Sequence, residues 1–504
     1  MKNQPLKALN NPDIPGVNLA DLKVLMVSSE AVPFAKTGGL ADVAGSLPPA
    51  LVRQGVEAAL VLPAYRTILE SGYSWRPVIG NMPVPLGNAM LPTDVLEGET
   101  EEGVRVYLID REDLFNRPNL YGNRHGDYYD NLERFSFFCH GALRLANALS
   151  ITPDLLHLHD WQTGLIPALL KGPYWDWPNL TGMPTVFTIH NLGYQGNFGS
   201  DRLWVTGLSH SQFYHADGLE YWGSFSLLKS GIVYAHAVTT VSPTYAREIQ
   251  TDQGGMAMAA VLRSRGGDVR GILNGVDYGI WNPETDPHIE THYTLRDTTG
   301  KGRCKAALLR ELHLDANLME APLLCIISRL DEQKGFDLLL SAIDGIMETG
   351  AGLVILGSGK AWISHALSEA QNRFPGRMAL RTGFDVNLAH RMIAGSDIFL
   401  MPSLYEPCGL TQMYAFKYGT VPVARGTGGL EDTVLSFDPP TREGNGFKFY
   451  SYDALDFLQS VQEAVRLYRK RPVWEQLMQN GMKMDFSWDR SAKAYTDIYR
   501  SIKR

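Results

Sequence analysis

The chain has 504 residues, of which 44% are hydrophobic and 20% charged, and a formal net charge of -8. This length is too great for a single hydrophobic core and predicts two or three domains, while the negative charge argues against nucleic acid as the main partner. No apolar run reaches the 18 or more residues that a membrane span requires, so we expect a soluble protein with no membrane partner.

Residues 1–21 show neither the apolar core of a secretion signal nor the Arg and Ser richness of a transit peptide. We interpret them as a disordered lead-in. The four cysteines, Cys139, Cys304, Cys325 and Cys408, lie far apart and form no CxxC pair. That spacing favours reduced thiols over disulfides or zinc ligands and predicts a cytoplasmic location.

The first predicted strand, residues 23–28, leads into Lys36-Thr37-Gly38-Gly39-Leu40 and then a helix. Paired glycines let the backbone approach a ligand closely, and Lys36 adds a cation beside the helix N-terminus. The spacing matches neither a dinucleotide fingerprint nor a P-loop. Pro48 and Pro49 are expected to kink or restart that helix.

Residues 75–102 are rich in Pro and Gly and fit β-ribbons that decorate a sheet. After another strand at 104–109, residues 115–129 form a loop rich in Tyr, Asn and Gly. Aromatic rings and amides are suited to gripping sugar rings. A surface loop pinned by core tyrosines is an equally open interpretation.

Two further predicted strands carry polar groups at their carboxyl ends. Residues 155–159 run into His159 and Asp160, and residues 185–189 run into His190. Such groups could be metal ligands, but in an open parallel sheet the crevice lies outside the strand ends, and hydrogen bonding to a substrate is the simpler use. A histidine there is also often only a satisfied loop residue.

A domain boundary is predicted at Asn274-Gly275, a strong turn signal that follows a helix at 224–235 and a strand at 237–241. A second alternation of strands and helices begins after it, with strands at 323–328, 353–356, 378–381, 398–401 and 421–424. This alternation is the signature of an α/β protein whose parallel sheets carry helices on both faces. Both halves are therefore expected to be Rossmann-like.

The second half carries two turns of chemical interest. Arg329 and Lys334 flank a turn after a buried-type strand, where they could be a solvated pair or could hold two phosphates. Glu406 lies in a Pro-flanked turn before the helix that Gly409 opens, so a carboxylate meets free backbone N–H groups. That arrangement favours a polar, partly anionic ligand.

Several of these segments together resemble the bacterial-type, ADP-glucose-using family of glycogen and starch synthases. The resemblance rests on the Lys36-x-Gly38-Gly39-Leu40 motif, on His159-Asp160-Trp161, on the Thr-Ile-His-Asn run around His190, on residues 328–335 and on residues 402–432. It implies a GT-B glycosyltransferase in which two Rossmann-like domains, 22–272 on the acceptor side and 273–486 on the nucleotide-sugar side, face each other across a cleft. It also implies a last helix, 487–504, that returns to the first domain.

The resemblance implies a retaining glucosyltransferase that moves glucose from ADP-glucose to the non-reducing end of glycogen or another α-1,4-glucan. Roles carried over by position assign catalysis to Arg329, Lys334, Glu406, His190 and Asp160, and substrate binding to Lys36, Gly38, Gly39, Asn274, Gly383, Cys408, Gly409, Leu410, Thr411 and Tyr414. We expect no cofactor and no metal, because the sequence has no Asp-x-Asp pair. Tyr414 stands where related transferases have a ribose-binding Glu, which leaves the ribose contact open.

Two other functions fit parts of this pattern. A nucleotide-sugar epimerase of the same architecture would turn over without a glucan. A non-catalytic glucan-binding relative would not need Lys36, His190, Arg329, Lys334 and Glu406 all intact, as they are here. Release of ADP from ADP-glucose in the presence of glycogen separates the three possibilities.

Overall fold

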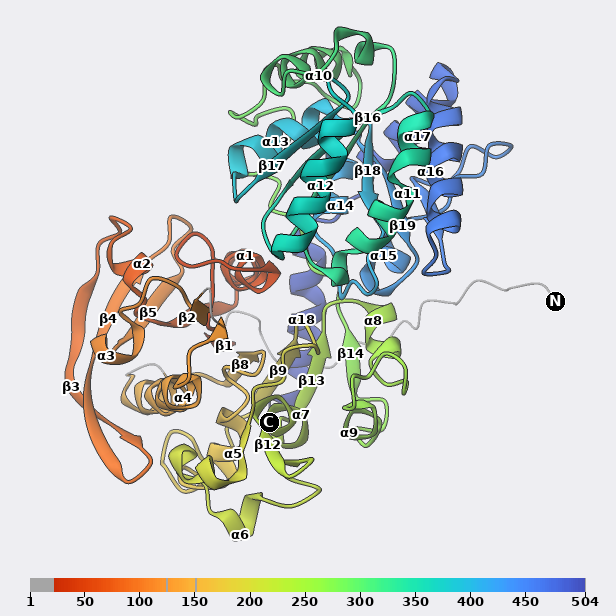
Figure 1. Cartoon of the computed structure of the whole chain (residues 1–504). Coiled ribbons are helices and arrows are strands. Elements are labelled where there is room, and N and C mark those ends of the chain that lie inside the picture. The colour runs from red at the N-terminus through yellow and green to blue at the C-terminus, as the bar shows by residue number, and fades with distance from the viewer. Residues whose placement is uncertain (1–21, 124–125, 150–151, 504) are drawn as a thin grey trace.

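The structure is a computed structural model that describes residues 22–123, 126–149 and 152–503. The proposed disordered lead-in, residues 1–21, lies outside this range. Figure 1 shows two bodies, one built from the first half of the chain and one from the second. Within the described residues, no helix combines the length and apolar character needed to cross a membrane.

The first body is built around a sheet that, within the described residues, has nine strands in the order β14-β13-β9-β8-β1-β2-β5-β4-β3. The strands from β14 to β5 are parallel, and β4 and β3 add an antiparallel ribbon at one edge. The ribbon expected in residues 75–102 is thus confirmed. The strands are β1 (Lys23–Val27), β2 (Glu57–Pro63), β3 (Arg76–Leu86), β4 (Ala89–Glu99), β5 (Arg105–Asp110), β8 (Leu155–His159), β9 (Thr185–Ile189), β13 (Ala237–Thr240) and β14 (Val269–Gly271).

The central strands β8 and β9 are buried along their whole length, as expected for parallel strands covered on both faces. Pro48 and Pro49 lie inside a helix that neither ends nor restarts there. Both rings are buried, and packing against the core outweighs the lost backbone hydrogen bonds. The main helices of this body are α1 (Gly39–Arg53), α4 (Asn131–Ala148), α5 (Ile166–Lys171), α7 (Leu227–Tyr234) and α8 (Pro243–Glu248).

The prediction of one helix over residues 224–235 is wrong at its start. Residues Ser224–Ser226 form strand β12, which pairs with β10 (Asn197–Gly199) and β11 (Glu220–Tyr221). The helix begins only at Leu227, where the Ser226 hydroxyl accepts a hydrogen bond from the Lys229 N–H at 3.2 Å. Pairing with distant strands therefore overrides the local helical pattern.

The second body is built around a parallel sheet that, among the described residues, has six strands in the order β17-β16-β15-β18-β19-β20. Its strands are β15 (Leu323–Ile327), β16 (Gly352–Gly357), β17 (Met378–Thr382), β18 (Ile398–Met401), β19 (Val421–Arg425) and β20 (Phe447–Phe449). Its main helices are α10 (Thr299–Glu311), α11 (Phe336–Glu348), α12 (Ala361–Arg373), α13 (Val386–Gly395), α14 (Thr411–Lys417), α15 (Gly428–Thr433), α16 (Ala454–Tyr468) and α17 (Arg471–Met482). The predicted α/β architecture with two parallel sheets is confirmed.

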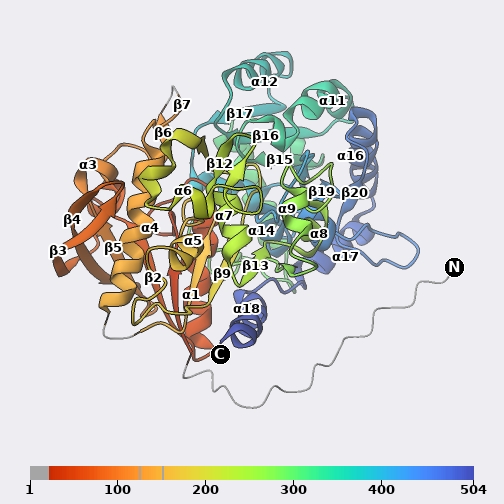
Figure 2. The same ribbon diagram turned by 90° about the horizontal axis from the view of Figure 1, so that it is seen from below.

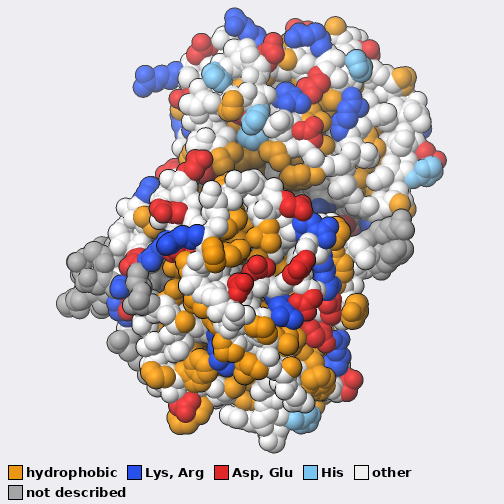
Figure 3. Space-filling view, turned by 90° about the vertical axis from the view of Figure 1, so that its left-hand side faces the viewer, with side chains coloured by type: hydrophobic (Ala, Val, Ile, Leu, Met, Phe, Trp, Pro, Cys, Tyr) orange, Lys and Arg blue, Asp and Glu red, His pale blue; other side chains and the backbone are white. Residues whose placement is uncertain are grey.

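The last helix, α18 (Trp488–Ile502), lies against the first body rather than the second, as both ribbon views show (Figures 1 and 2). Its Tyr499 hydroxyl is 2.7 Å from Nδ1 of His157 on β8. The two chain segments that connect the bodies run side by side, since the Val276 N–H donates to the Phe486 carbonyl at 2.7 Å. The space-filling view shows the bodies as two masses that meet at a waist (Figure 3).

Candidate functional site

The turn between β18 and α14 places Glu406 at the carboxyl edge of the second sheet. The Glu406 side chain is buried, and its Oε2 lies 2.6 Å from Nζ of Lys334 and accepts a hydrogen bond from the Ser403 hydroxyl at 3.0 Å. A buried carboxylate is stable only when paired and hydrogen-bonded, and both conditions are met here. Lys334 keeps a fifth of its side chain exposed, so its ammonium remains open to a further anion.

A second turn, after β19, supports the first by direct backbone contact. The Gly429 N–H donates to the Glu406 carbonyl at 3.1 Å. A Cβ atom on Gly428 would lie 1.9 Å from that same carbonyl oxygen, and one on Gly429 would lie 2.1 Å from the Cys408 carbonyl oxygen. Gly428 also has a φ of +48°, which disfavours other residues. These glycines are therefore required for the two turns to pack together.

Arg329 follows β15 and reaches from the second body to the first. Its Nη1 donates to the Tyr194 hydroxyl at 2.8 Å and lies 3.4 Å from Oδ2 of Asp331. Almost half of its side chain, 45%, is exposed. Gly335 ends the same turn with a φ of +73°, and a Cβ there would lie 1.9 Å from the Pro402 carbonyl oxygen. The Arg329 turn thus packs directly against the start of the Glu406 turn.

On the first body, the Lys36 loop is shaped by the buried carboxylate of Glu30. This carboxylate accepts the backbone N–H groups of Thr37 at 2.5 Å and Gly38 at 3.2 Å. It also accepts a hydrogen bond from the Tyr121 hydroxyl at 2.7 Å. This bond ties the loop to the aromatic segment 115–129, of which the structure describes all but residues 124 and 125. Lys36 pairs with Asp42 at 2.6 Å.

The Lys36 loop faces the Glu406 turn across the junction of the two bodies. A Cβ on Gly39 would lie 3.7 Å from a methyl group of Leu410, which follows Gly409 directly. A Cβ on Gly38 would meet no described atom within 4 Å, so its backbone borders open space. Residues predicted from the two halves therefore meet at one place.

His190 and Asp160 lie together at the carboxyl ends of β9 and β8. The Asp160 Oδ1 accepts the His190 backbone N–H at 2.7 Å, and Asp160 itself has a left-handed φ of +56°. Burial raises the pKa of Asp160 to about 7, although the N–H groups of His190 and Asn191 lower it. Burial lowers the pKa of His190 to about 3, so its imidazole is neutral at pH 7.

Some of the remaining predicted residues lie close to the Glu406 turn, and others lie farther from it. Cys408, Gly409, Leu410 and Thr411 continue the Glu406 turn into α14. Burial raises the pKa of the Cys408 thiol, and the backbone of Asn274 opposes this rise. Tyr414 is buried with its ring stacked on Trp281 at 4.1 Å between ring centroids. Gly383 follows β17, the edge strand of the sheet, two strands away from the strand that carries Arg329.

Three residues that contribute to this geometry were not among the predicted site residues: Glu30, Tyr194 and His159. A usable signal existed for Glu30, since a carboxylate between a strand and a Gly-Gly loop is suited to accept the loop N–H groups. Tyr194 gave no comparable signal, because its partner Arg329 lies 135 positions away. His159 was considered among the polar groups at the strand ends but was given no role of its own.

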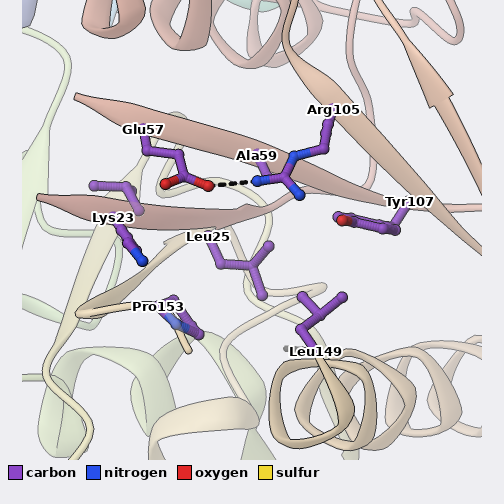
Figure 4. A pocket seen from close by; sticks show the side chains of 9 residues that line it. Lys23, Leu25, Glu57, Ala59, Arg105, Tyr107, Leu149 and Pro153 are labelled. Carbon is purple, nitrogen blue, oxygen red and sulfur yellow. Dashed lines mark hydrogen bonds and ion pairs between the residues drawn. The ribbon is translucent and has the colours of Figure 1, made fainter. Parts of the chain in front are cut away.

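A small hollow of the first body, shown in Figure 4, lies elsewhere. It is lined by Lys23, Glu57 and Arg105, which begin β1, β2 and β5, and by Tyr107 and Leu149. These strand starts are at the opposite edge of the sheet from Glu30, Asp160 and His190. The hollow is therefore not part of the candidate site.

The family models and the similar proteins that match this chain all point to one group of enzymes. Residues 23–264 match the family described as Starch synthase catalytic domain, and residues 315–481 match Glycosyl transferases group 1. A glycogen synthase of an Anaeromyxobacter species is 46% identical over 95% of this chain and 99% of its own length. A glycogen synthase of Thermotoga maritima is 42% identical over 95% of this chain and 98% of its own length.

Two solved structures extend the comparison. The catalytic domain of Starch Synthase IV from Arabidopsis thaliana, bound to ADP and acarbose, is 34% identical and superposes with a TM-score of 0.89 over 96% of this chain and all of that one. A sucrose-phosphate synthase from Thermosynechococcus elongatus is 18% identical with a TM-score of 0.58 over 95% of this chain and 99% of that one, a likeness of fold alone.

Proposed function

Because this chain belongs to the family of starch and glycogen synthases, we propose that it moves glucose from ADP-glucose to the non-reducing end of an α-1,4-glucan and releases ADP. Membership makes the chain a glycosyltransferase that transfers glucose in glycogen or starch synthesis, with a nucleotide sugar as donor and a glucan as acceptor. ADP as the nucleotide is supported by the plant starch synthase, whose structure holds ADP.

The observation that carries the proposal is the pairing of Lys334 with Glu406 beside Arg329, opposite the Lys36 loop. A guanidinium fork and an ammonium at the carboxyl ends of the strands suit the two phosphates of a nucleoside diphosphate. Negative charge grows on the diphosphate as the glycosidic bond breaks, and these cations would stabilise it. The Lys36 ammonium and the Gly38 and Gly39 backbone would complete the anion side from the first body.

The transferred glucose would lie between Glu406 and His190. Glu406 accepts hydrogen bonds from sugar hydroxyls while Lys334 neutralises its charge. His190, neutral at pH 7, offers one hydrogen bond from its ring but no positive charge. Asp160 fixes the His190 backbone, and the N–H groups of Cys408, Gly409, Leu410 and Thr411 lie at the start of α14, where a helix N-terminus favours an anion.

The proposed reaction retains the configuration of the anomeric carbon. The acceptor hydroxyl attacks that carbon from the face on which the diphosphate leaves, the carbon–oxygen bond to the phosphate breaks, and a phosphate oxygen takes the hydroxyl proton. No protein nucleophile takes part in this scheme. The role of the protein is to position the two substrates and to stabilise the leaving diphosphate.

The test is to incubate the protein with ADP-glucose and glycogen and to measure ADP release and incorporation of glucose into glycogen. We expect both in equal amounts, with a kcat/KM for ADP-glucose well above that for UDP-glucose. Comparable kcat/KM values for the two donors would refute the proposed donor. Turnover of the donor without glycogen would indicate the epimerase, and glycogen binding without ADP release would indicate a binding protein.

The location we propose is the cytoplasm, where thiols stay reduced. All four cysteines are buried and unbridged in the structure. A disulfide detected in protein isolated under non-reducing conditions would contradict this location.

A further inference from the structure

The histidine that precedes Asp160 contacts the proposed sugar-binding histidine directly. Nδ1 of His159, at the end of β8, lies 2.9 Å from Nε2 of His190, which follows β9. The His159 side chain is fully buried, and among the described residues its other ring nitrogen, Nε2, has no hydrogen-bond partner. Neighbouring strands β8 and β9 therefore hold two imidazoles in one hydrogen bond.

The protonation of this pair is constrained by its surroundings. Burial lowers the pKa of His190 to about 3, and burial together with His157 and His190 lowers the pKa of His159 well below its usual value. Both rings are therefore neutral at pH 7, and each carries one proton. A single N–H lies in the bond between them, and it belongs either to His159 or to His190.

The two arrangements differ in what they leave buried without a partner. If His190 donates, the proton of His159 must lie on Nε2, where the described residues offer no acceptor. If His159 donates, only a lone pair remains unpaired at that nitrogen. Buried N–H groups without a partner are rarer in proteins than under-satisfied acceptors. The second arrangement is therefore favoured.

We infer that His159 donates from Nδ1 to Nε2 of His190 and thereby holds His190 as the tautomer protonated on Nδ1, ready to donate to a hydroxyl of the transferred sugar. His159 is then a positioning residue that sets the hydrogen-bond polarity of the site without touching the substrate. The inference about the sugar rests on the proposed function, whereas the tautomer itself does not.

The remaining contacts of His190 agree with this role. Its backbone N–H is bound by Asp160, and Nε2 is bound by His159. These contacts leave Nδ1 as the ring nitrogen available to a ligand, and 8% of the His190 surface is exposed. Consecutive residues, His159 and Asp160, therefore fix the ring and the backbone of one histidine.

The tautomer can be measured directly in the full-length protein labelled with ¹⁵N at histidine. NMR experiments that use two-bond couplings distinguish a protonated ring nitrogen from a bare one, and the His190→Gln variant assigns the signals. His140 supplies an internal reference, because its Nε2 lies 3.0 Å from the Thr206 carbonyl oxygen and must donate to it. We expect His190 to show the opposite tautomer to His140. The same tautomer as His140 would overturn the inference.

Kinetics test the functional consequence. His159→Phe keeps a ring but removes the donor, whereas His159→Asn keeps an N–H near the Nδ1 position. We expect the Phe variant to lose kcat by about 10- to 100-fold, as when the partner that orients a histidine is removed elsewhere, with little change in the KM for ADP-glucose. The Asn variant should recover most of that loss.

His140→Asn, which removes another buried histidine of the first body, is the matched control for folding. Equal kcat values for His159→Phe and His159→Asn, at thermal stability equal to that of the His140→Asn control, would overturn the positioning role. Should His159→Phe fail to fold, the NMR result on the unmodified protein decides the question. Absence of ADP release by the unmodified protein would instead refute the proposed function and leave the tautomer measurement valid.

Discussion

Replacing Asp160 by Asn should make the protein more stable, and by an amount that grows with pH. The Asp160 carboxyl is buried, and its pKa of about 7 in the folded protein lies well above the usual 3.8. The folded state therefore holds a proton that the unfolded chain has lost. Between pH 4 and pH 7 the unfolded state binds fewer protons than the folded state, so stability falls as pH rises through that window.

The size of this stability change follows from the gap between the pKa of Asp160 in the folded protein and in the unfolded chain. Each pH unit between pH 5 and pH 7 lowers the free energy of unfolding by about 1.4 kcal/mol, so the wild type loses about 2 to 3 kcal/mol between pH 5 and pH 8 through this group. An Asn side chain keeps an oxygen to accept the His190 N–H but has no charge to bury. The advantage of Asp160→Asn over the wild type should therefore be about 2 to 3 kcal/mol larger at pH 8 than at pH 5.

Urea titrations of the wild type and of Asp160→Asn at pH 5 and pH 8 measure this difference. The free energy of unfolding the second body is common to both proteins and cancels in the comparison. Asp176→Asn, which changes an exposed carboxyl of the same body, serves as the control and should show the same stability difference at both pH values. An Asp160→Asn advantage that does not change between pH 5 and pH 8 would refute the reasoning.

Three other predictions follow from the proposed function. Arg329→Ala and Lys334→Ala should each lower kcat by about 10²- to 10³-fold while raising the KM for ADP-glucose by a smaller factor. Arg329→Lys should recover little of the lost kcat, because an ammonium cannot form a bidentate fork. A raised KM with near-normal kcat, measured by ADP release, would make the two cations mere binding groups. Activity should survive EDTA, because protein cations meet the charge of the diphosphate; recovery of chelated enzyme by Mg²⁺ or Mn²⁺ would show otherwise. Truncation after Phe486 removes α18 with its buried Trp488 and Tyr499 and should lower both Tm and activity; unchanged values would contradict a role for that helix.

The fold was predictable from sequence to the extent that local patterns decide it. Apolar, β-branched runs such as residues 185–189 and 398–401 became buried parallel strands within a residue or so of their expected ends. Ser224–Ser226 was mispredicted because its partners, β10 and β11, are short strands with no pattern of their own. The helix through Pro48 and Pro49 shows the same limit for the expected restart, which does not occur because core packing outweighs the preference of proline; the expected kink stays a prediction.

Many residues of the candidate site were predictable from the sequence, but the contacts between them were not. Lys36, His190, Arg329 and Glu406 each follow a predicted strand, and their roles were predicted because the motifs that contain them resemble those of the synthase family. Their connections were not, because Lys334 and Glu406 are 72 positions apart and only folding pairs them. Glu30 and His159 act on other protein groups, so neither carries a motif of its own.

Several contacts between the two bodies lie at the turns of the candidate site. The Ser242 hydroxyl donates to the Pro407 carbonyl at 2.5 Å, and the Glu248 carboxylate accepts the Gly428 N–H at 3.0 Å. The turn that carries Glu406 is therefore braced from the first body as well as the second. Arg329 also reaches the first body, through Tyr194.

Under the proposed function, a diphosphate on Arg329 would compete with the Tyr194 hydroxyl for the same guanidinium. A hydrogen bond between a charged and a neutral group contributes about 1.5–3 kcal/mol, less than a bidentate, charge-assisted pair with phosphate provides. If Arg329 holds the diphosphate as proposed, exchange of the hydroxyl for phosphate would therefore be favourable, and it would remove the contact that Arg329 makes across the junction. Under the proposed function, binding of the donor would then weaken the junction at one side chain, while the Ser242 and Glu248 contacts still hold the Glu406 turn to the first body.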